Sequence, residues 1–151
     1  MYDYELRSYG ETEREIYFVT IRARRTRVDL TVRPMIQIIE DGFQHAMESW
    51  AWQVGYYAIL RDHVHFFLAP VHRLHAPPGS RALELPDFLR EWKRWTSQRA
   101  ESLGERVSLW QADYYSKRLT SAEDYQQLRS NPCHLVDRIP HEGEMSPLDW
   151  Y

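Results

Sequence analysis

The stretch that decides the fold of this chain is Val54-Gly55-Tyr56-Tyr57-Ala58-Ile59-Leu60, then Arg61-Asp62, then His63-Val64-His65-Phe66-Phe67-Leu68-Ala69. Two apolar runs separated by a short polar break predict two antiparallel strands joined by a tight turn. Because successive side chains of a strand point to opposite faces, His63 and His65 project together from one face of the second strand. The hairpin therefore predicts a sheet with two imidazoles side by side on one face.

The two imidazoles form a candidate site for a divalent metal. Two histidines on a rigid strand supply two ligands, and one more oxygen or nitrogen ligand must come from elsewhere in the chain. A solvated strand face is the simple alternative, because a short His-x-His motif also arises by chance. A zinc hydrolase would need three protein ligands, and the sequence shows no second histidine or cysteine cluster at a suitable spacing. We interpret Asp62 as a turn residue or as the carboxylate that orients a histidine ligand.

The segments on both sides of the hairpin are predicted to form further strands and helices. Residues 16–23 alternate in the way of a strand, and a helix is expected after Pro34, with apolar residues at helical spacing. A second helix is expected from Leu85, a fourth strand at Val107–Trp110, and a third helix capped by Ser121. The first helix has the apolar stripe Ile36, Ile39, Phe43, Met47 and Trp50.

The order β-α-β-β-α-β-α predicts an α+β fold. We expect a ferredoxin-like split βαβ sandwich, in which an antiparallel sheet carries its helices on one face. The histidine pair would lie on a central strand, and the third helix could pack near it.

Size and composition favour one folded domain. The chain has 151 residues, of which 43% are apolar and 14% aromatic, which is enough to build a core and argues against disorder. We expect a single domain over residues 1–151, with a core at about residues 15–136 between irregular ends. The lone Cys133 allows no disulfide within the chain, and no stretch resembles a signal peptide or a membrane span. We therefore expect a cytoplasmic protein that does not enter a membrane.

The distribution of charge bears on the partner. A net charge of −3 speaks against nucleic acid, because phosphate contacts dominate that kind of binding. Basic residues are nevertheless concentrated in two regions, while acidic residues gather near the two ends of the chain. A solvated face is the alternative for either region. The candidate DNA-binding residues are Arg22, Arg24, Arg25 and Arg27 in the first region, and Arg90, Lys93 and Arg94 in the second.

Several stretches, in the right order, resemble the single-tyrosine HUH transposases, especially the transposases associated with repetitive extragenic palindromes (REP). The resemblance extends from about Tyr17 to Val136. It is carried by the strand 17–22, the strand 57–66 with its His-hydrophobic-His motif, the helix 85–96, and the C-terminal stretches 109–115 and Asn131-Pro132.

The resemblance implies a function as well as a fold. Such proteins bind single-stranded DNA and DNA hairpins, and they hold Mg²⁺ or Mn²⁺ with two histidines and a polar ligand from the last helix. In this chain the ligands would be His63, His65 and Asn131, with His134 as the alternative third ligand. The metal polarises a DNA phosphate, and a tyrosine attacks it to form a 5′-phosphotyrosine from which the strand can be rejoined. Relatives occur as monomers and as dimers, so a homodimer is one expected assembly.

One position departs from the family's pattern. The family has its nucleophilic tyrosine four residues before the ligand asparagine, and this chain has Gln127 there. Tyr125 is the candidate catalytic residue, but two helical positions differ by about 200° of rotation, so it cannot take the same place in a regular helix. Three interpretations stay open, of which we favour the first. Cleavage is lost and a DNA-binding module remains, or Tyr125 acts through a distorted helix, or Tyr114 or Tyr115 replaces it.

Overall fold

The computed structural model describes residues 15–24, 29–71, 76–104, 108–130 and 141–148. Its strands are β1 (Tyr17–Arg22), β2 (Trp52–Ile59), β3 (His63–Pro70), β4 (Tyr115–Arg118) and β5 (His141–Glu144). Its helices are α2 (Arg33–Ser49), α3 (Leu85–Ala100) and α4 (Ala122–Ser130), with a short 3-10 helix, η2, at Glu101–Leu103.

The five strands form one sheet in the order β4-β1-β3-β2-β5, and each neighbouring pair is antiparallel. The first four strands have the order of a split βαβ sandwich, in which each helix connects strands that are not neighbours. The predicted α+β fold with an antiparallel sheet is confirmed.

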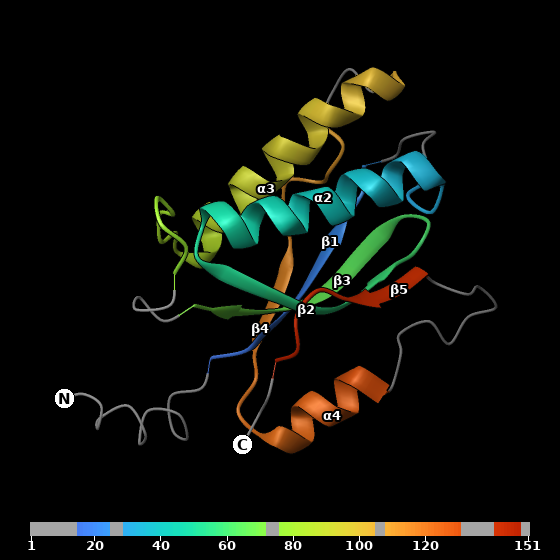
Figure 1. Ribbon diagram of the computed structural model, residues 1–151. Helices are drawn as coiled ribbons and strands as arrows, with labels where there is room; N and C mark the ends of the chain where they lie inside the picture. Colours follow the sequence, from blue (N-terminus) through green and yellow to red (C-terminus); the bar gives the residue numbers. More distant parts are fainter. Residues whose placement is uncertain (1–14, 25–28, 72–75, 105–107, 131–140, 149–151) are drawn as a thin grey trace.

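The helices lie on both faces of the sheet (Figure 1). Helices α2 and α3 cover one face, as predicted, and α4 lies against the opposite face. The larger core lies between the sheet and α2 and α3, and the side chains of β3 that face it include Val64, Phe66 and Leu68. A second, smaller core lies under α4. It consists of Ile16, Phe67, Ala69, Leu119, Tyr125 and Leu148.

The fourth strand does not lie where the sequence pattern placed it. Within the expected segment Val107–Trp110, Trp110 makes only an isolated bridge to Ala23, and Val107 lies outside the described residues. The strand itself is Tyr115–Arg118, which pairs with β1 at the edge of the sheet. An edge strand with polar, exposed side chains has no apolar alternation, so the pattern that predicts buried strands could not find it.

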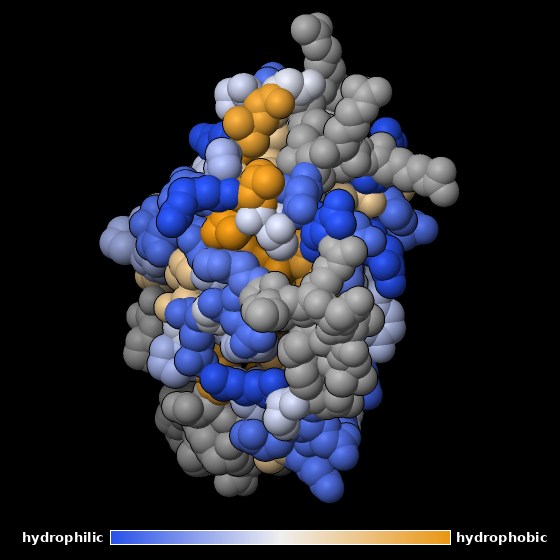
Figure 2. Space-filling view, turned by 90° about the vertical axis from the view of Figure 1, so that its right-hand side faces the viewer, coloured by the Kyte–Doolittle hydropathy of each residue, from blue (hydrophilic) through white to orange (hydrophobic). Residues whose placement is uncertain are grey.

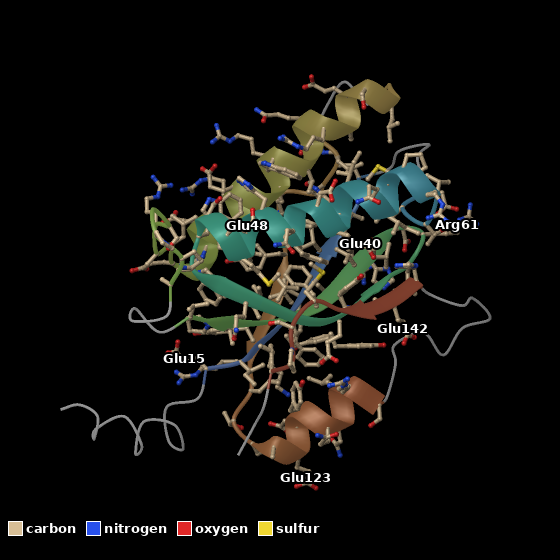
Figure 3. All side chains as sticks on the ribbon, viewed as in Figure 1. Glu15, Glu40, Glu48, Arg61, Glu123 and Glu142 are labelled. Carbon is tan, nitrogen blue, oxygen red and sulfur yellow. The ribbon has the colours of Figure 1, made fainter. Side chains whose placement is uncertain are left out.

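Strand β5 lies in the C-terminal stretch that was expected to be irregular. It pairs with β2 at the edge of the sheet, and a carboxylate of α2 contacts it from the helical layer. Glu40, labelled in Figure 3, accepts a hydrogen bond from the Tyr57 hydroxyl, and its Oε2 atom lies 2.9 Å from His141 Nε2. Burial, together with the Glu40 carboxylate, raises the pKa of Tyr57 above its ordinary value, so this hydroxyl stays protonated and keeps donating.

The face shown in Figure 2 is mostly hydrophilic, with a small group of hydrophobic residues near its centre. Among the described residues, no helix combines the length and the apolar character that a membrane span requires.

Close contact between α2 and α3 depends on the amphipathic pattern of both helices. Proline stands at the first turn of each, where its missing N–H costs nothing. The buried Phe43 of α2 stacks on Trp92 of α3, with 5.4 Å between their ring centroids. Beside this pair Gly42 leaves no room for a side chain. An added Cβ would lie 2.8 Å from Trp92 Nε1 and 2.9 Å from Thr96 Cγ2.

We expect Gly42→Ala to destabilise the protein, although alanine favours a helix by about 1 kcal/mol over glycine. The Trp92 ring is fully buried, so the new methyl group overpacks the contact at a cost of about 1–3 kcal/mol. Urea unfolding should show a lower free energy of unfolding. The exposed Gln44→Ala on the same helix is the control and should change it by less than about 0.5 kcal/mol. A more stable Gly42→Ala protein would contradict the packing argument.

Candidate metal centre and nucleic-acid interface

His63 and His65 lie two residues apart on β3, and their ring centroids are 4.6 Å apart at an angle of 79°. The register of β1 and β3 pairs Arg22 with His63 and Thr20 with His65, so these four side chains share one face of the sheet. That face is the one on which α4 packs, because Phe67, two residues further along β3, contacts Tyr125 of α4. The register agrees with the prediction that both imidazoles project from one face of the sheet.

Each imidazole has an oxygen atom beside its Nδ1. His63 Nδ1 lies 2.8 Å from the Asp62 carboxylate, and His65 Nδ1 lies 2.7 Å from the Thr20 hydroxyl. When a neutral imidazole donates its Nδ1 proton to such an oxygen, its Nε2 carries the lone pair that a metal needs. The hydrogen bond from His63 also lowers the pKa of the Asp62 carboxyl below its ordinary value, so Asp62 is an acceptor at neutral pH. The role of Asp62 as a carboxylate beside a histidine ligand fits this geometry.

The described residues provide two of the three expected ligands. Asn131 and its alternative His134 both lie outside the described residues. Within residues 15–24, 29–71, 76–104, 108–130 and 141–148, no group of three histidine, cysteine, aspartate or glutamate side chains could hold a metal ion. The histidine pair therefore fits a divalent metal with respect to its donor atoms, and the third ligand stays a prediction.

A hollow of about 490 Å³ opens beside His65. Tyr115 of β4 pairs with Thr20, which in turn pairs with His65, so the tyrosine is on the same face two strands away. Tyr115 is the most exposed large hydrophobic residue among those that the structure describes, at 55%. The sequence indicated Tyr114 and Tyr115 only as replacements for a nucleophile and gave no sign of the pocket. Its lining is Thr20, Arg22, His65, Gln111, Asp113, Tyr114 and Tyr115.

A second hollow of about 590 Å³ runs along the outer side of α3, and Tyr114 lines both hollows. Arg90, Lys93 and Arg94, which were predicted to bind DNA, all line this second hollow. Arg90 pairs with Asp87 at 2.5 Å and Arg94 with Glu91 at 2.6 Å. These ion pairs lie on the surface, where such pairs contribute little to stability. Either guanidinium can therefore exchange its carboxylate partner for a phosphate.

Lys93 differs from the two arginines beside it. Its ammonium group donates to the backbone carbonyls of Gln111, Ala112 and Asp113 at 2.8, 3.0 and 3.0 Å. An ammonium group has three protons, so these bonds use its full donor capacity. Burial lowers the pKa of Lys93 below its ordinary value. In this structure Lys93 holds the loop before β4, and its predicted contact with DNA would require these bonds to break.

The first basic region is described only in part. Arg22 is exposed at the end of β1 and lines the hollow beside His65. Arg24 is exposed two residues later, and its backbone N–H donates to the carbonyl of Leu109. Arg25 and Arg27 lie outside the described residues. The structure thus brings Arg22 together with the histidine pair.

Tyr125, the candidate catalytic residue, lies in the small core under α4. Only 3% of it is exposed, and its ring contacts Phe67 edge-on with 4.9 Å between the centroids. Its hydroxyl accepts a hydrogen bond of 3.3 Å from Arg129, one helical turn later. Gln127, at the family's tyrosine position, is exposed. Tyr125 therefore has a packing role in this structure, and its role as a nucleophile stays a prediction.

We expect Asp62→Ala to lower the affinity of the protein for Mn²⁺ about 10- to 100-fold, because His63 loses the acceptor that fixes its tautomer and ring orientation. Calorimetric titration of the DNA-free protein with Mn²⁺ measures this affinity. Asp62→Asn keeps an acceptor oxygen and serves as the matched control, with a smaller loss. Equal Mn²⁺ affinities for Asp62→Ala and the unchanged protein would contradict the proposed orienting role.

No protein-family model matches the sequence, and no curated protein matches it either. Solved structures, in contrast, do match this chain. One is a REP-associated tyrosine transposase bound to a REP hairpin, at a TM-score of 0.56 and 17% sequence identity. The match covers 75% of this chain but only 61% of that one. Another is a putative transposase from Deinococcus radiodurans R1, at a TM-score of 0.54 and 16% identity, covering 78% of this chain and 88% of that one.

These likenesses concern the arrangement of the backbone, because identities of 16% and 17% are too low to carry over side-chain roles. They agree with the fold that the sequence pattern and the sheet order indicate independently. The chain therefore has the fold of the REP-associated tyrosine transposases.

Proposed function

We propose that this protein binds DNA hairpins and the single strand beside them, and that His63 and His65 hold Mg²⁺ or Mn²⁺ at a DNA phosphate. The observation that carries the proposal is the arrangement of β1 and β3. It combines two imidazoles, each with an oxygen beside its Nδ1, with the guanidinium of Arg22 on one face. Metal and guanidinium groups both favour a phosphate oxygen.

Two further observations support DNA as the source of the phosphate. Tyr114 lines both the hollow beside His65 and the hollow along α3, where Arg90 and Arg94 lie on the surface. A surface that combines cationic and aromatic side chains suits a single strand, whose backbone is charged and whose bases stack. The similar transposase structure is itself bound to a REP hairpin.

Asn131 is the proposed third ligand, since the family resemblance assigns it that role. When bound, the metal supplies Lewis-acid polarisation of the phosphate. Asp62 and Thr20 hold the two imidazoles in orientation, and Arg22 binds a phosphate oxygen.

Strand cleavage through a phosphotyrosine is the second candidate function. Tyr125 would be its nucleophile in the predicted scheme, but that hydroxyl lies in a core cluster and is bonded to Arg129. The observation that favours cleavage is the presence of a different tyrosine, Tyr115, in the hollow that His65 lines. Binding without cleavage is the function that the geometry supports best.

We expect His63→Ala to weaken the Mn²⁺-dependent part of hairpin binding at least about 10-fold, because one of two described ligands is lost. Fluorescence anisotropy with a labelled, tailed DNA hairpin, with Mn²⁺ and with EDTA, measures that part. His141→Ala is the matched control, because this partly exposed histidine bonds Glu40 on the other side of the sheet. Equal Mn²⁺ dependence in His63→Ala and the unchanged protein would overturn the metal assignment. A denaturing gel of the same samples would show cleavage or a covalent adduct.

The salt dependence of binding should separate Arg22 from Lys93. Each phosphate contact on single-stranded DNA contributes about 0.7 to the slope of log K against log salt concentration. We expect Arg22→Gln to reduce the slope by about this amount. Lys93→Gln should leave it unchanged, since its ammonium protons serve the loop carbonyls. An equal reduction in both variants would show that Lys93 leaves the loop to bind phosphate.

A further inference from the structure

The hollow beside His65 contains more chemistry than a metal site requires. Besides His65, it is lined by two exposed tyrosines, a guanidinium, a carboxylate and a side-chain amide. Its volume of about 490 Å³ lies within the range of about 300–1,000 Å³ typical of small-molecule pockets. A solvent-exposed strand does not require this combination of side chains for its stability.

We propose that this hollow binds one unpaired nucleotide of a DNA strand, with the base stacked on Tyr115 and the phosphate at Arg22. The inference rests on the proposed DNA-binding function and deepens it, because it names a single unpaired nucleotide as the ligand of this pocket.

The position of Tyr115 carries the stacking part of the inference. Neighbouring strands of a sheet lie about 4.8 Å apart, so Tyr115 and His65, two strands apart on one row, are separated by about 10 Å at their backbones. One nucleotide can bridge such a separation between its phosphate and its base. Because Tyr115 is 55% exposed, a base can stack on its ring.

Arg22 carries the phosphate part. It pairs with His63 in the sheet register and lines the hollow together with His65, so its side chain projects from the same face as the histidine pair. A guanidinium presents a planar fork that binds two oxygens of one phosphate. The phosphate would then lie on the side of the hollow nearest the histidines, and the base on the side of β4.

Gln111 and Asp113 indicate which bases fit. The Gln111 amide nitrogen donates to the carbonyl of Ala23 at 3.1 Å, which leaves its Oε1 as the acceptor for a ligand. An ionised Asp113 carboxylate only accepts. Two acceptors favour a base with an exocyclic amino group, such as cytosine, over thymine, which has none.

The wall that carries these residues is fixed before any ligand binds. Lys93 holds the carbonyls of residues 111–113, and the N–H of Gln111 donates to the carbonyl of Arg22 at 2.9 Å. The adjacent Trp110 ring donates to Thr96 of α3 at 2.8 Å. A wall that is already ordered lowers the entropy cost of binding, so the affinity of the pocket reflects the contacts themselves.

The test compares two labelled hairpins in the presence of Mn²⁺, one blunt and one with a single-stranded tail of cytidines. Stacking contributes about 1–3 kcal/mol per base, so Tyr115→Ala should bind the tailed hairpin about 5- to 150-fold more weakly. Its affinity for the blunt hairpin should not change. Tyr115→Phe keeps the ring and should bind both hairpins as the unchanged protein does. Lys117→Ala, on the same strand but outside the lining of the hollow, is the control and should not distinguish the two hairpins.

A thermodynamic cycle tests the same contact from the DNA side. Abasic residues are placed at successive tail positions, and one of them should weaken binding by the unchanged protein by the factor lost in Tyr115→Ala. The same abasic residue should cost Tyr115→Ala nothing further. A thymidine tail should bind more weakly than a cytidine tail, and Asp113→Asn should reduce that difference.

The outcomes distinguish a failure of the proposed pocket from a failure of the proposed DNA-binding function. If Tyr115→Ala binds the tailed hairpin as tightly as the unchanged protein, the proposal of a nucleotide pocket is wrong, and the DNA-binding proposal stands. If Tyr115→Phe binds as weakly as Tyr115→Ala, stacking is wrong and the hydroxyl is the group that matters. If the unchanged protein binds neither hairpin, the proposed function fails, and the nucleotide pocket fails with it.

Discussion

The candidate site depends on the antiparallel register of β1 against β3. This pairing aligns Arg22 with His63 and Thr20 with His65, and one face of the sheet thereby gains two oriented imidazoles and a cation. A shift by one residue would turn Thr20 and Arg22 to the opposite face and bring Val19 and Ile21 onto the face of the histidines. The buried face prevents such a shift. Val19, Ile21, Val64 and Phe66 are fully buried under α2 and α3, so moving them into solvent would cost several kcal/mol.

The same helices that enforce the register also position the wall of the hollow. Phe43 and Trp92 pack at the contact of α2 and α3, and Trp92 also contacts Trp110, whose ring bonds Thr96. One turn of α3 therefore anchors the chain just before residues 111–113, and Lys93 in that turn bonds their carbonyls. Packing in the main core is in this way coupled to the geometry of a surface pocket. Substitutions in this part of α3 would therefore change the shape of the proposed nucleotide pocket even where they do not line it.

The sequence predicted what depends on apolar periodicity. The hairpin of β2 and β3, the helices α2 and α3 and the common face of the histidines all have strong patterns, and all are confirmed. The edge strands β4 and β5 were missed, because they are short and polar and are held by backbone pairing and by contacts such as that of Glu40 with His141. The pocket at Tyr115 could not be predicted for the same reason. It depends on which residue of β4 stands opposite Thr20, and no local pattern specifies that pairing.

The two positions of α4 that differ from the family's pattern can be understood from the helix itself. Tyr125 and Gln127 are separated by about 200° of rotation, so a helix that buries one must expose the other. The structure buries Tyr125 against Phe67 and exposes Gln127. Turning Tyr125 toward solvent would remove a large side chain from a small core, at a cost of about 1.5–3 kcal/mol. A tyrosine that stabilises the attachment of α4 is thus poorly suited to leave it in each reaction cycle. Tyr115 of β4, by contrast, is already exposed in the hollow that His65 also lines, so its exposure requires no such loss of packing.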